Sequence, residues 1–219
     1  MLSVDVFWSF RSPYCYLLGP RLLGLARDFD VSVHIRPIYP IAIRVPGYFR
    51  GRNPMARRYL VHDVVRIGEM LGLSLVWPTP DPIAMNLDTG EVYADQPYIS
   101  RLTRLAIAAV DAGRGLEFAL YVSSLIFGGT KNWHEGDHLR TAVSQAGLDI
   151  DKLDDVARND VDRLEAAIRK NEADHQAAGH WGVPLMTFQN EPFFGQDRYD
   201  VLMWRLRQHG LKARAGTEE

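Results

Sequence analysis

The sequence predicts an α/β protein in which a long helical segment interrupts a small sheet domain. Strand-like segments, apolar and rich in β-branched or aromatic residues, occur only near the two ends of the 219-residue chain. Between them the apolar residues recur with helical spacing, and no segment carries a strong strand pattern. The first two strand-like segments enclose a helical pattern, which is typical of a right-handed, parallel βαβ unit.

The composition is that of a folded protein and excludes several classes of partner. With 47% hydrophobic and 24% charged residues, the chain can bury a core and is not disordered. A net charge of -2 argues against nucleic acid or an anionic membrane as the main partner. No apolar run approaches the roughly 18 residues of a membrane-spanning helix, and the first residues do not resemble a signal peptide. We therefore expect a cytoplasmic protein.

The N-terminal βαβ unit begins with a strand at Val4–Ser9. A helix is predicted from Pro13, because leucines recur on one face and end at Arg27–Asp30. Ser12 is placed to cap this helix, and a proline suits its first position since the missing N–H costs nothing there. Val31–Arg36 alternates as a second strand.

The middle of the chain is predicted to be helical. It opens with a proline- and glycine-rich loop of roughly 15 residues, a length that usually indicates a function. Helices are then predicted over Met55–Leu71, Tyr98–Ala112, Leu116–Phe127, Asp137–Gln145 and Asp160–Ala178. We expect residues 41–179 to form a mainly helical insertion domain.

Strands return near the C-terminus. Val183–Phe188 and Pro192–Gly195 predict a hairpin with a loose turn at Gln189–Glu191, and Asp197–Gln208 predicts a final helix. The order β-α-β, helices, β-β-α is that of a thioredoxin-like fold with an all-helical insertion. Residues 1–40 and 180–219 would then form the thioredoxin-like domain.

Two segments at opposite ends of the chain carry a family resemblance. One is Phe10–Leu17 (FRSPYCYL), and the other is Gly182-Val183-Pro184 followed by Phe193–Arg198 (FFGQDR). Together they resemble the DsbA-type branch of the thioredoxin superfamily. More narrowly, the chain looks like the 2-hydroxychromene-2-carboxylate isomerases and kappa-class glutathione transferases, over its whole length and in order. Trp133–Gly136 also resembles the insertion of that group.

The residues at the start of the first helix indicate what chemistry is available. In a thioredoxin fold this position presents a C-x-x-C motif, where the helix N-terminus stabilises a thiolate. Here the four residues are Ser12-Pro13-Tyr14-Cys15, so exchange between two cysteines is not available to one chain. The Ser12 hydroxyl can instead donate a hydrogen bond to a thiolate from another molecule. Glutathione is the abundant candidate, and Ser12 is the predicted catalytic residue.

The resemblance implies further glutathione-binding residues. The proline of Val183-Pro184 is expected to be cis, which leaves the Val183 backbone free to pair with the cysteine of glutathione. The backbone before the last helix, with the Gln196 side chain, suits the γ-glutamyl carboxylate, and Asp197 suits its ammonium group. Arg198 completes this segment.

Asn53 and a following basic residue, Arg57 or Arg58, resemble the pair that contacts the glycine end of glutathione. The aromatic and proline-rich loops at Tyr39–Phe49 and Trp77–Asp95 would suit a small aromatic substrate. By family analogy we also expect a homodimer.

Two other functions remain open. Cys15 alone could act as a redox thiol in thiol-disulfide exchange, although a solitary helical cysteine is more often buried and inert. Alternatively, the chain could be a non-catalytic thioredoxin-like binding module in which Ser12 is only a helix cap; Asp197 could likewise be a cap. The sequence does not decide between isomerase and transferase chemistry, both of which would borrow the glutathione thiolate.

The other residues that could carry chemistry have simpler interpretations. His134 and His138 have the spacing of a helical metal pair, but Gly136 interrupts the helix, so we predict no metal site. His175 and His180 are interpreted as solvated residues at a helix end. Packing roles are predicted for most tryptophans, namely Trp77, Trp133, Trp181 and Trp204, while Trp8 and Phe10 are expected to line the pocket beside Ser12.

Overall fold

A four-stranded mixed sheet lies at the centre of the molecule. The structure, a computed structural model, describes residues 1–49, 53–86 and 89–214, without the side chains of Pro54 and Arg57. The strands are β1 (Leu2–Trp8), β2 (Val31–Pro37), β3 (Leu185–Phe188) and β4 (Glu191–Phe194). Their order is β2-β1-β3-β4, with β1 and β2 parallel and β3 antiparallel to both of its neighbours. This arrangement confirms the predicted thioredoxin-like fold.

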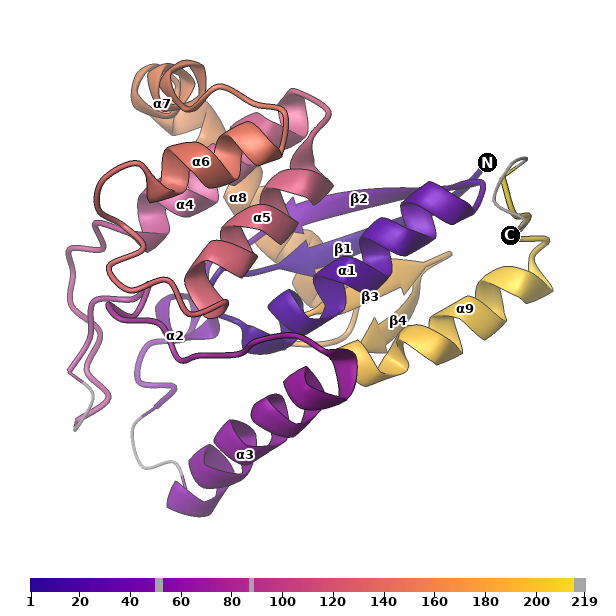
Figure 1. The fold of residues 1–219 in the computed structure, drawn as a ribbon, viewed down its shortest axis with the longest axis horizontal. Helices are drawn as coiled ribbons and strands as arrows, with labels where there is room; N and C mark the ends of the chain where they lie inside the picture. The colour runs from indigo at the N-terminus through magenta and orange to yellow at the C-terminus, as the bar shows by residue number, and fades with distance from the viewer. Residues whose placement is uncertain (50–52, 87–88, 215–219) are drawn as a thin grey trace.

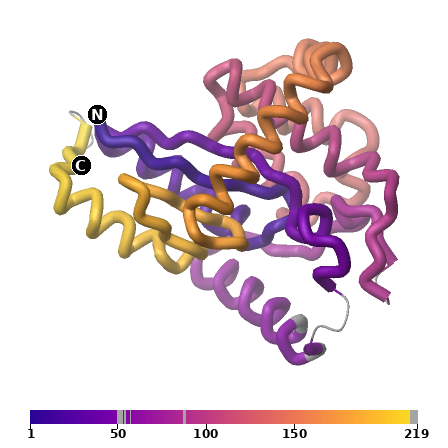
Figure 2. The backbone as a smooth tube through the Cα atoms, turned by 180° about the vertical axis from the view of Figure 1, so that it is seen from behind, coloured from indigo at the N-terminus to yellow at the C-terminus, as the bar shows by residue number. Residues whose placement is uncertain are grey.

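Helices cover both faces of the sheet (Figures 1 and 2). Helix α1 (Pro13–Asp28) and helix α9 (Tyr199–Gln208) lie on one face, and α8 (Val161–Ala177) crosses the other. The side chains of β1 alternate between the faces. Val4, Val6 and Trp8 belong to the main core, whereas Phe7 joins a smaller cluster with Leu185.

The remaining helices are gathered mainly at one end of the sheet. Helices α4 (Ile99–Asp111), α5 (Gly115–Phe127), α6 (His138–Gln145) and α7 (Ile150–Asn159) form this group, and α3 (Pro54–Leu71) extends separately beside the start of α1 (Figure 1). The predicted helices are confirmed to within about two residues, the usual uncertainty of helix ends. Helix α7 and the short α2 (Ile41–Arg44) were not predicted. The two-domain bounds stay a prediction.

The sequence suggested that Trp8 and Phe10 line a pocket beside Ser12. In the structure both side chains are fully buried, so they do not. The Trp8 indole N–H donates to Ser123 Oγ at 3.3 Å, and the Phe10 ring packs edge-on against Phe118. Both side chains therefore join the sheet to α5. Both belong to the main core cluster, which leaves neither side chain exposed beside Ser12.

The β3–β4 hairpin has a tighter turn than predicted. Only Gln189 and Asn190 lie between the strands, with φ angles of 50° and 66°. Two consecutive residues with positive φ are typical of a type I′ turn, which matches the twist of a hairpin. At the opposite end of this hairpin lies the Val183-Pro184 segment. Among the described residues, no helix combines the length and apolarity needed to cross a membrane.

Candidate functional site

Ser12 and Val183 meet at the first turn of α1. Ser12 caps the helix, and its Oγ accepts a hydrogen bond from the Cys15 N–H at 3.3 Å. The same hydroxyl donates to the Val183 carbonyl oxygen at 3.3 Å. The Val183-Pro184 peptide bond is cis, as the resemblance implied. The two segments that carried the resemblance are therefore in direct contact.

The backbone around Val183 leaves one donor uncommitted. No described residue accepts a hydrogen bond from the Val183 N–H, and the Val183 carbonyl binds only the Ser12 hydroxyl. The next carbonyl, that of Pro184, accepts the Gly195 N–H at 2.9 Å. This bond brings the segment before α9 alongside Val183.

The Gly195–Arg198 segment places its side chains in different environments. Gln196 is only 5% exposed, and its Oε1 has no hydrogen-bond partner among the described residues. Asp197 is exposed and lies 3.2 Å from the Arg198 guanidinium. Its charge also acts on Tyr14: the pKa of Tyr14 is raised chiefly by burial, then by the hydrogen bond to Asp63, with a contribution from Asp197. The Asp197 charge therefore acts on a residue in the first turn of α1.

The structure does not join Asn53 to this cluster. Asn53 is exposed and caps α3, with its Oδ1 accepting the Met55 N–H at 2.9 Å. No contact between described residues connects its side chain with Ser12 or Val183. Arg58 is exposed on α3, and the side chain of Arg57 lies outside the described part of the chain.

Cys15 has an environment that disfavours its reactive form. The side chain is fully buried one turn into α1. Burial raises the pKa of the Cys15 thiol to about 12, against the opposing hydrogen bonds with Ser9 and Ser12. A thiol that stays protonated at neutral pH is a poor nucleophile.

Three side chains hold the segment before Val183 in place. His175 was interpreted as solvated, but it is 1% exposed, and its Nε2 lies 2.8 Å from the Gly182 carbonyl oxygen. Burial lowers the pKa of His175 to about 4, so the ring is neutral near pH 7 and its N–H donates to that carbonyl. His180 Nδ1 accepts the Gly182 N–H at 2.9 Å, and Arg44 donates to the Trp181 carbonyl at 3.1 Å.

Sequence reasoning missed this support because a histidine near a polar helix end carries no signal of burial. The interpretation of the tryptophans was also incomplete. Trp133 is buried as predicted, whereas Trp77, Trp181 and Trp204 are exposed. Trp181 is the one that directly precedes the Gly182-Val183 segment.

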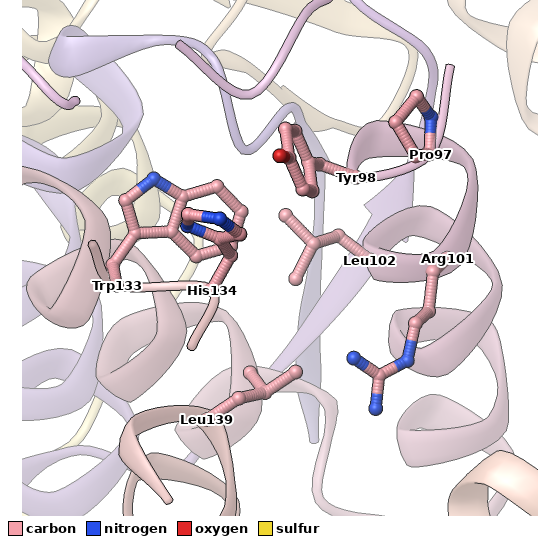
Figure 3. Close-up of a pocket in the computed structure, with 7 residues that line it drawn as sticks. All are labelled: Pro97, Tyr98, Arg101, Leu102, Trp133, His134 and Leu139. Carbon is pink, nitrogen blue, oxygen red and sulfur yellow. The ribbon is translucent and has the colours of Figure 1, made fainter. Parts of the chain in front are cut away.

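A cavity of about 190 Å³ lies away from Ser12, between the starts of α4 and α6 (Figure 3). It is lined by Pro97, Tyr98, Arg101, Leu102, Trp133, His134 and Leu139. The His134 ring packs against Tyr98 at 4.8 Å within this wall. Among the described residues, no group of three or more His, Cys, Asp or Glu side chains could hold a metal ion.

Comparison with known proteins finds relatives over nearly the whole chain. The chain is 27% identical over 213 residues to a 2-hydroxychromene-2-carboxylate isomerase from Pseudomonas putida, covering 92% of each protein. It is 25% identical over 202 residues to the isomerase of that name from Sphingobium xenophagum, covering 91% of this chain and 95% of the relative.

Solved structures share the fold. A 2-hydroxychromene-2-carboxylate isomerase superposes with a TM-score of 0.72 at 18% identity, covering 95% of this chain and 96% of the other. The cytosolic disulfide reductase DsbM from Pseudomonas aeruginosa, solved with GSH, superposes with a TM-score of 0.57 at 16% identity, covering 94% and 100%. The family model for the DSBA-like thioredoxin domain matches residues 3–207. The chain therefore belongs to the DSBA-like thioredoxin family.

Proposed function

We propose that this protein is a glutathione-dependent isomerase of 2-hydroxychromene-2-carboxylate or a related aromatic, conjugated carbonyl compound. The contact between the Ser12 hydroxyl and the Val183 carbonyl carries the proposal, because it places an alcohol and a strand-like backbone at one helix tip. The named relatives favour isomerisation over transfer. A cytoplasmic location, where reduced glutathione is abundant, and a homodimer are parts of the same proposal.

The residues present fit the cysteine portion of glutathione. The Val183 N–H has no partner among the described residues, so it is available to a peptide carbonyl. Of the residues that the structure describes, Ser12 alone donates to the Val183 carbonyl, so an incoming peptide N–H can take that place. A peptide bound in this way would pair with Val183 as a short antiparallel strand does.

Binding of this kind would also free the Ser12 hydroxyl to donate its hydrogen bond to another acceptor. A serine hydroxyl has one proton to donate and two lone pairs that accept. Its proton now goes to Val183, while one lone pair takes the Cys15 N–H. When a peptide N–H takes over the Val183 carbonyl, the hydroxyl can turn and donate to the sulfur. The Cys15 N–H continues to hold the oxygen in place during this exchange.

The position of Ser12 favours negative charge on the sulfur. The N-terminus of α1 concentrates unpaired backbone N–H groups and the positive end of the helix dipole. A hydrogen bond from a neutral hydroxyl to a thiolate is charge-assisted and stronger than one to a thiol. Bound glutathione would supply a nucleophilic sulfur suited to reversible addition to a conjugated carbonyl compound, which is what isomerisation without consumption of the cofactor requires.

The ends of glutathione would be held by residues outside this central contact. Asp197 offers a carboxylate for the γ-glutamyl ammonium group, while the backbone from Gln196 to Arg198, where α9 begins, suits the neighbouring carboxylate. Asn53 and Arg57, at the start of α3, are proposed for the glycine end.

An enzyme that works through Cys15 is less well supported. Its thiol is buried, and burial raises its pKa to about 12, which opposes thiolate formation. The Cys15→Ala variant is therefore expected to keep its activity.

An assay of 2-hydroxychromene-2-carboxylate isomerisation, followed by absorbance with and without glutathione, tests the proposal. We expect turnover only with glutathione, and no fall in the glutathione concentration over many turnovers. Turnover without glutathione, or none under either condition, would contradict the proposal. Stoichiometric consumption of glutathione would instead identify a transferase.

A further inference from the structure

We propose that an aromatic rim beside Ser12 binds the planar ring of the substrate, and that Trp181 is its specificity-determining residue. The aromatic rim consists of Tyr48, Phe49, Trp181 and Phe194. This inference rests on the proposed function, since it concerns the second molecule that meets the glutathione sulfur. Nothing in the glutathione site itself requires these rings.

The aromatic rim is assembled from three separate parts of the chain. The Tyr48 and Phe49 rings lie 5.3 Å apart in the loop after α2. Tyr48 lies 6.0 Å from Trp181, which in turn lies 6.1 Å from Phe194 at the end of β4. These centroid distances are within the range at which aromatic rings interact.

The aromatic rim reaches Ser12 from both ends. At one end, the Arg11 guanidinium lies 5.1 Å from the centre of the Phe49 ring, and Arg11 directly precedes Ser12. At the other end, Gly182 joins Trp181 to Val183, whose carbonyl accepts the Ser12 hydroxyl. The aromatic rim is therefore linked to Ser12 on one side through Arg11 and on the other side through Val183.

Two of these rings are exposed, and the other two, Tyr48 and Phe49, are half-buried. Trp181 is 56% exposed and Phe194 is 39% exposed, although the chain around them is held by several hydrogen bonds. The Trp181 carbonyl accepts from Arg44, and the Gly182 peptide is bonded at both ends by His175 and His180. The His180 ring also stacks on Phe194 at 3.7 Å. A rigid, exposed aromatic face can bind a flat ligand at little cost in side-chain entropy.

Glutathione is a poor occupant for this face. It has no ring, and its polar peptide groups are accounted for by the Val183 backbone and the start of α9. An electrophile with an aromatic ring is the matching occupant, because offset or edge-on contacts between aromatic rings add binding energy beyond simple burial. The aromatic rim would thus hold the conjugated carbon next to the sulfur that Ser12 stabilises.

The test compares addition of glutathione to two enones, benzylideneacetone and its aliphatic counterpart ethylideneacetone, in which the sulfur that would leave after an isomerisation stays bound instead. Wild-type protein that adds glutathione to neither enone faster than the uncatalysed reaction would overturn the inference. In each reaction one S–C bond forms at the β carbon, the C=C bond is lost, and the thiol proton ends on the α carbon. We expect Trp181→Ala to lower kcat/KM about tenfold for the aryl enone and to leave the aliphatic enone within about twofold. Trp181→Phe should keep most of the preference for the aryl enone.

A matched control is available in Trp204, which is 51% exposed on α9, outside the aromatic rim. Trp204→Ala should change neither rate. Equal losses for both enones in Trp181→Ala, or no loss, would overturn the inference, as would a change of oligomeric state with unchanged selectivity. Calorimetric titration with glutathione separates the two proposals: wild-type protein that fails to bind glutathione contradicts the proposed function, whereas normal binding with unchanged aryl preference contradicts only the role of the aromatic rim.

Discussion

The Ser12 hydroxyl makes two hydrogen bonds: it accepts one from the Cys15 N–H and donates one to the Val183 carbonyl. The first bond is an ordinary helix cap, and the second reaches a residue at the other end of the chain. A helix cap needs only an acceptor oxygen, whereas a bond to an incoming thiolate needs a hydroxyl proton. Substitutions at this position can therefore separate stability from catalysis.

Ser12→Ala is expected to lower kcat by roughly 10²–10³-fold, as does the loss of one donor to a developing anion. It should also lower the free energy of unfolding by about 1 kcal/mol, because the cap is lost. Ser12→Asp restores an acceptor for the cap, but its ionised carboxylate has no proton to donate, so its stability should return while its activity stays low. Steady-state kinetics and urea unfolding check both. An active Ser12→Asp variant would show that a donated proton is not needed at this position.

His175 is a buried titratable residue that binds the segment carrying Val183, so its protonation affects the stability of the fold. Burial is the chief cause that lowers its pKa from the ordinary value of 6.5 to about 4, so folding favours the neutral ring. Between these two pH values the unfolded chain binds more protons than the folded one. The stabilisation is complete above about pH 6.5 and is lost as the pH falls toward 4.

We expect the wild type to lose up to about 3 kcal/mol of stability from this group over that interval. His175→Gln keeps an N–H for the Gly182 carbonyl but does not titrate there, so it should lose less stability on acidification. Urea unfolding of both proteins at about pH 7.5 and about pH 5 measures the difference. Parallel pH dependence in the two proteins would contradict a buried, neutral His175.

At the scale of elements, the β3–β4 hairpin positions the site by joining Val183-Pro184 to Gly195. Its turn places Gln189 and Asn190 at positive φ, a conformation that β-branched side chains rarely adopt. Gln189→Val should therefore lower the free energy of unfolding by about 1–2 kcal/mol, the cost of a left-handed conformation for such a residue. Gln189→Gly, which tolerates the φ angle, is the control and should be close to wild type. Equal stability of the valine and glycine variants in thermal unfolding would exclude this turn.

The elements that could be predicted from sequence are those with a local signal. The Ser12-Pro13 helix start, the leucine face of α1 and the β-branched strands each depend on residues within one turn or strand. Helix α7 was missed because its pattern is mostly polar, with only Ile150, Leu153 and Ala157 buried. The closeness of Ser12 and Val183 followed from the family resemblance, since no periodicity indicates a contact across the whole chain.

Burial was the property least accessible from sequence. His175 is buried because α8 crosses the sheet over Phe7, whereas Trp181 is exposed although it lies only a few residues before the interior strand β3. Both facts depend on how distant elements pack. Neither residue type nor local spacing determines them.

At the scale of the whole molecule, the site joins the two ends of the chain. Ser12 comes from the first βα connection, and Val183 and Gly195 come from the last hairpin, with the long helical segment between them. A ligand that contacts both parts binds only the folded state and must stabilise it. The melting temperature of the whole chain therefore reports on occupation of this site.

Glutathione at about 100 times its dissociation constant should add about 2.7 kcal/mol to the free energy of unfolding, which corresponds to about 5–10 °C in melting temperature. S-methylglutathione, which cannot form a thiolate, should give a smaller shift with the wild type. With Ser12→Ala the two ligands should give similar shifts. Differential scanning calorimetry checks this, and equal shifts for both ligands with the wild type would argue against thiolate recognition.

The central claim is that the Ser12 hydroxyl stabilises the thiolate of bound glutathione. The most direct measurement is a pH titration of the ultraviolet absorbance of that thiolate in complexes with wild type and Ser12→Ala. The pKa of the bound thiol should fall from about 8.5, the value of a free cysteine, to below about 7 in the wild type and should rise again in the variant. A bound thiol that titrates at the same pH in both proteins would contradict the account.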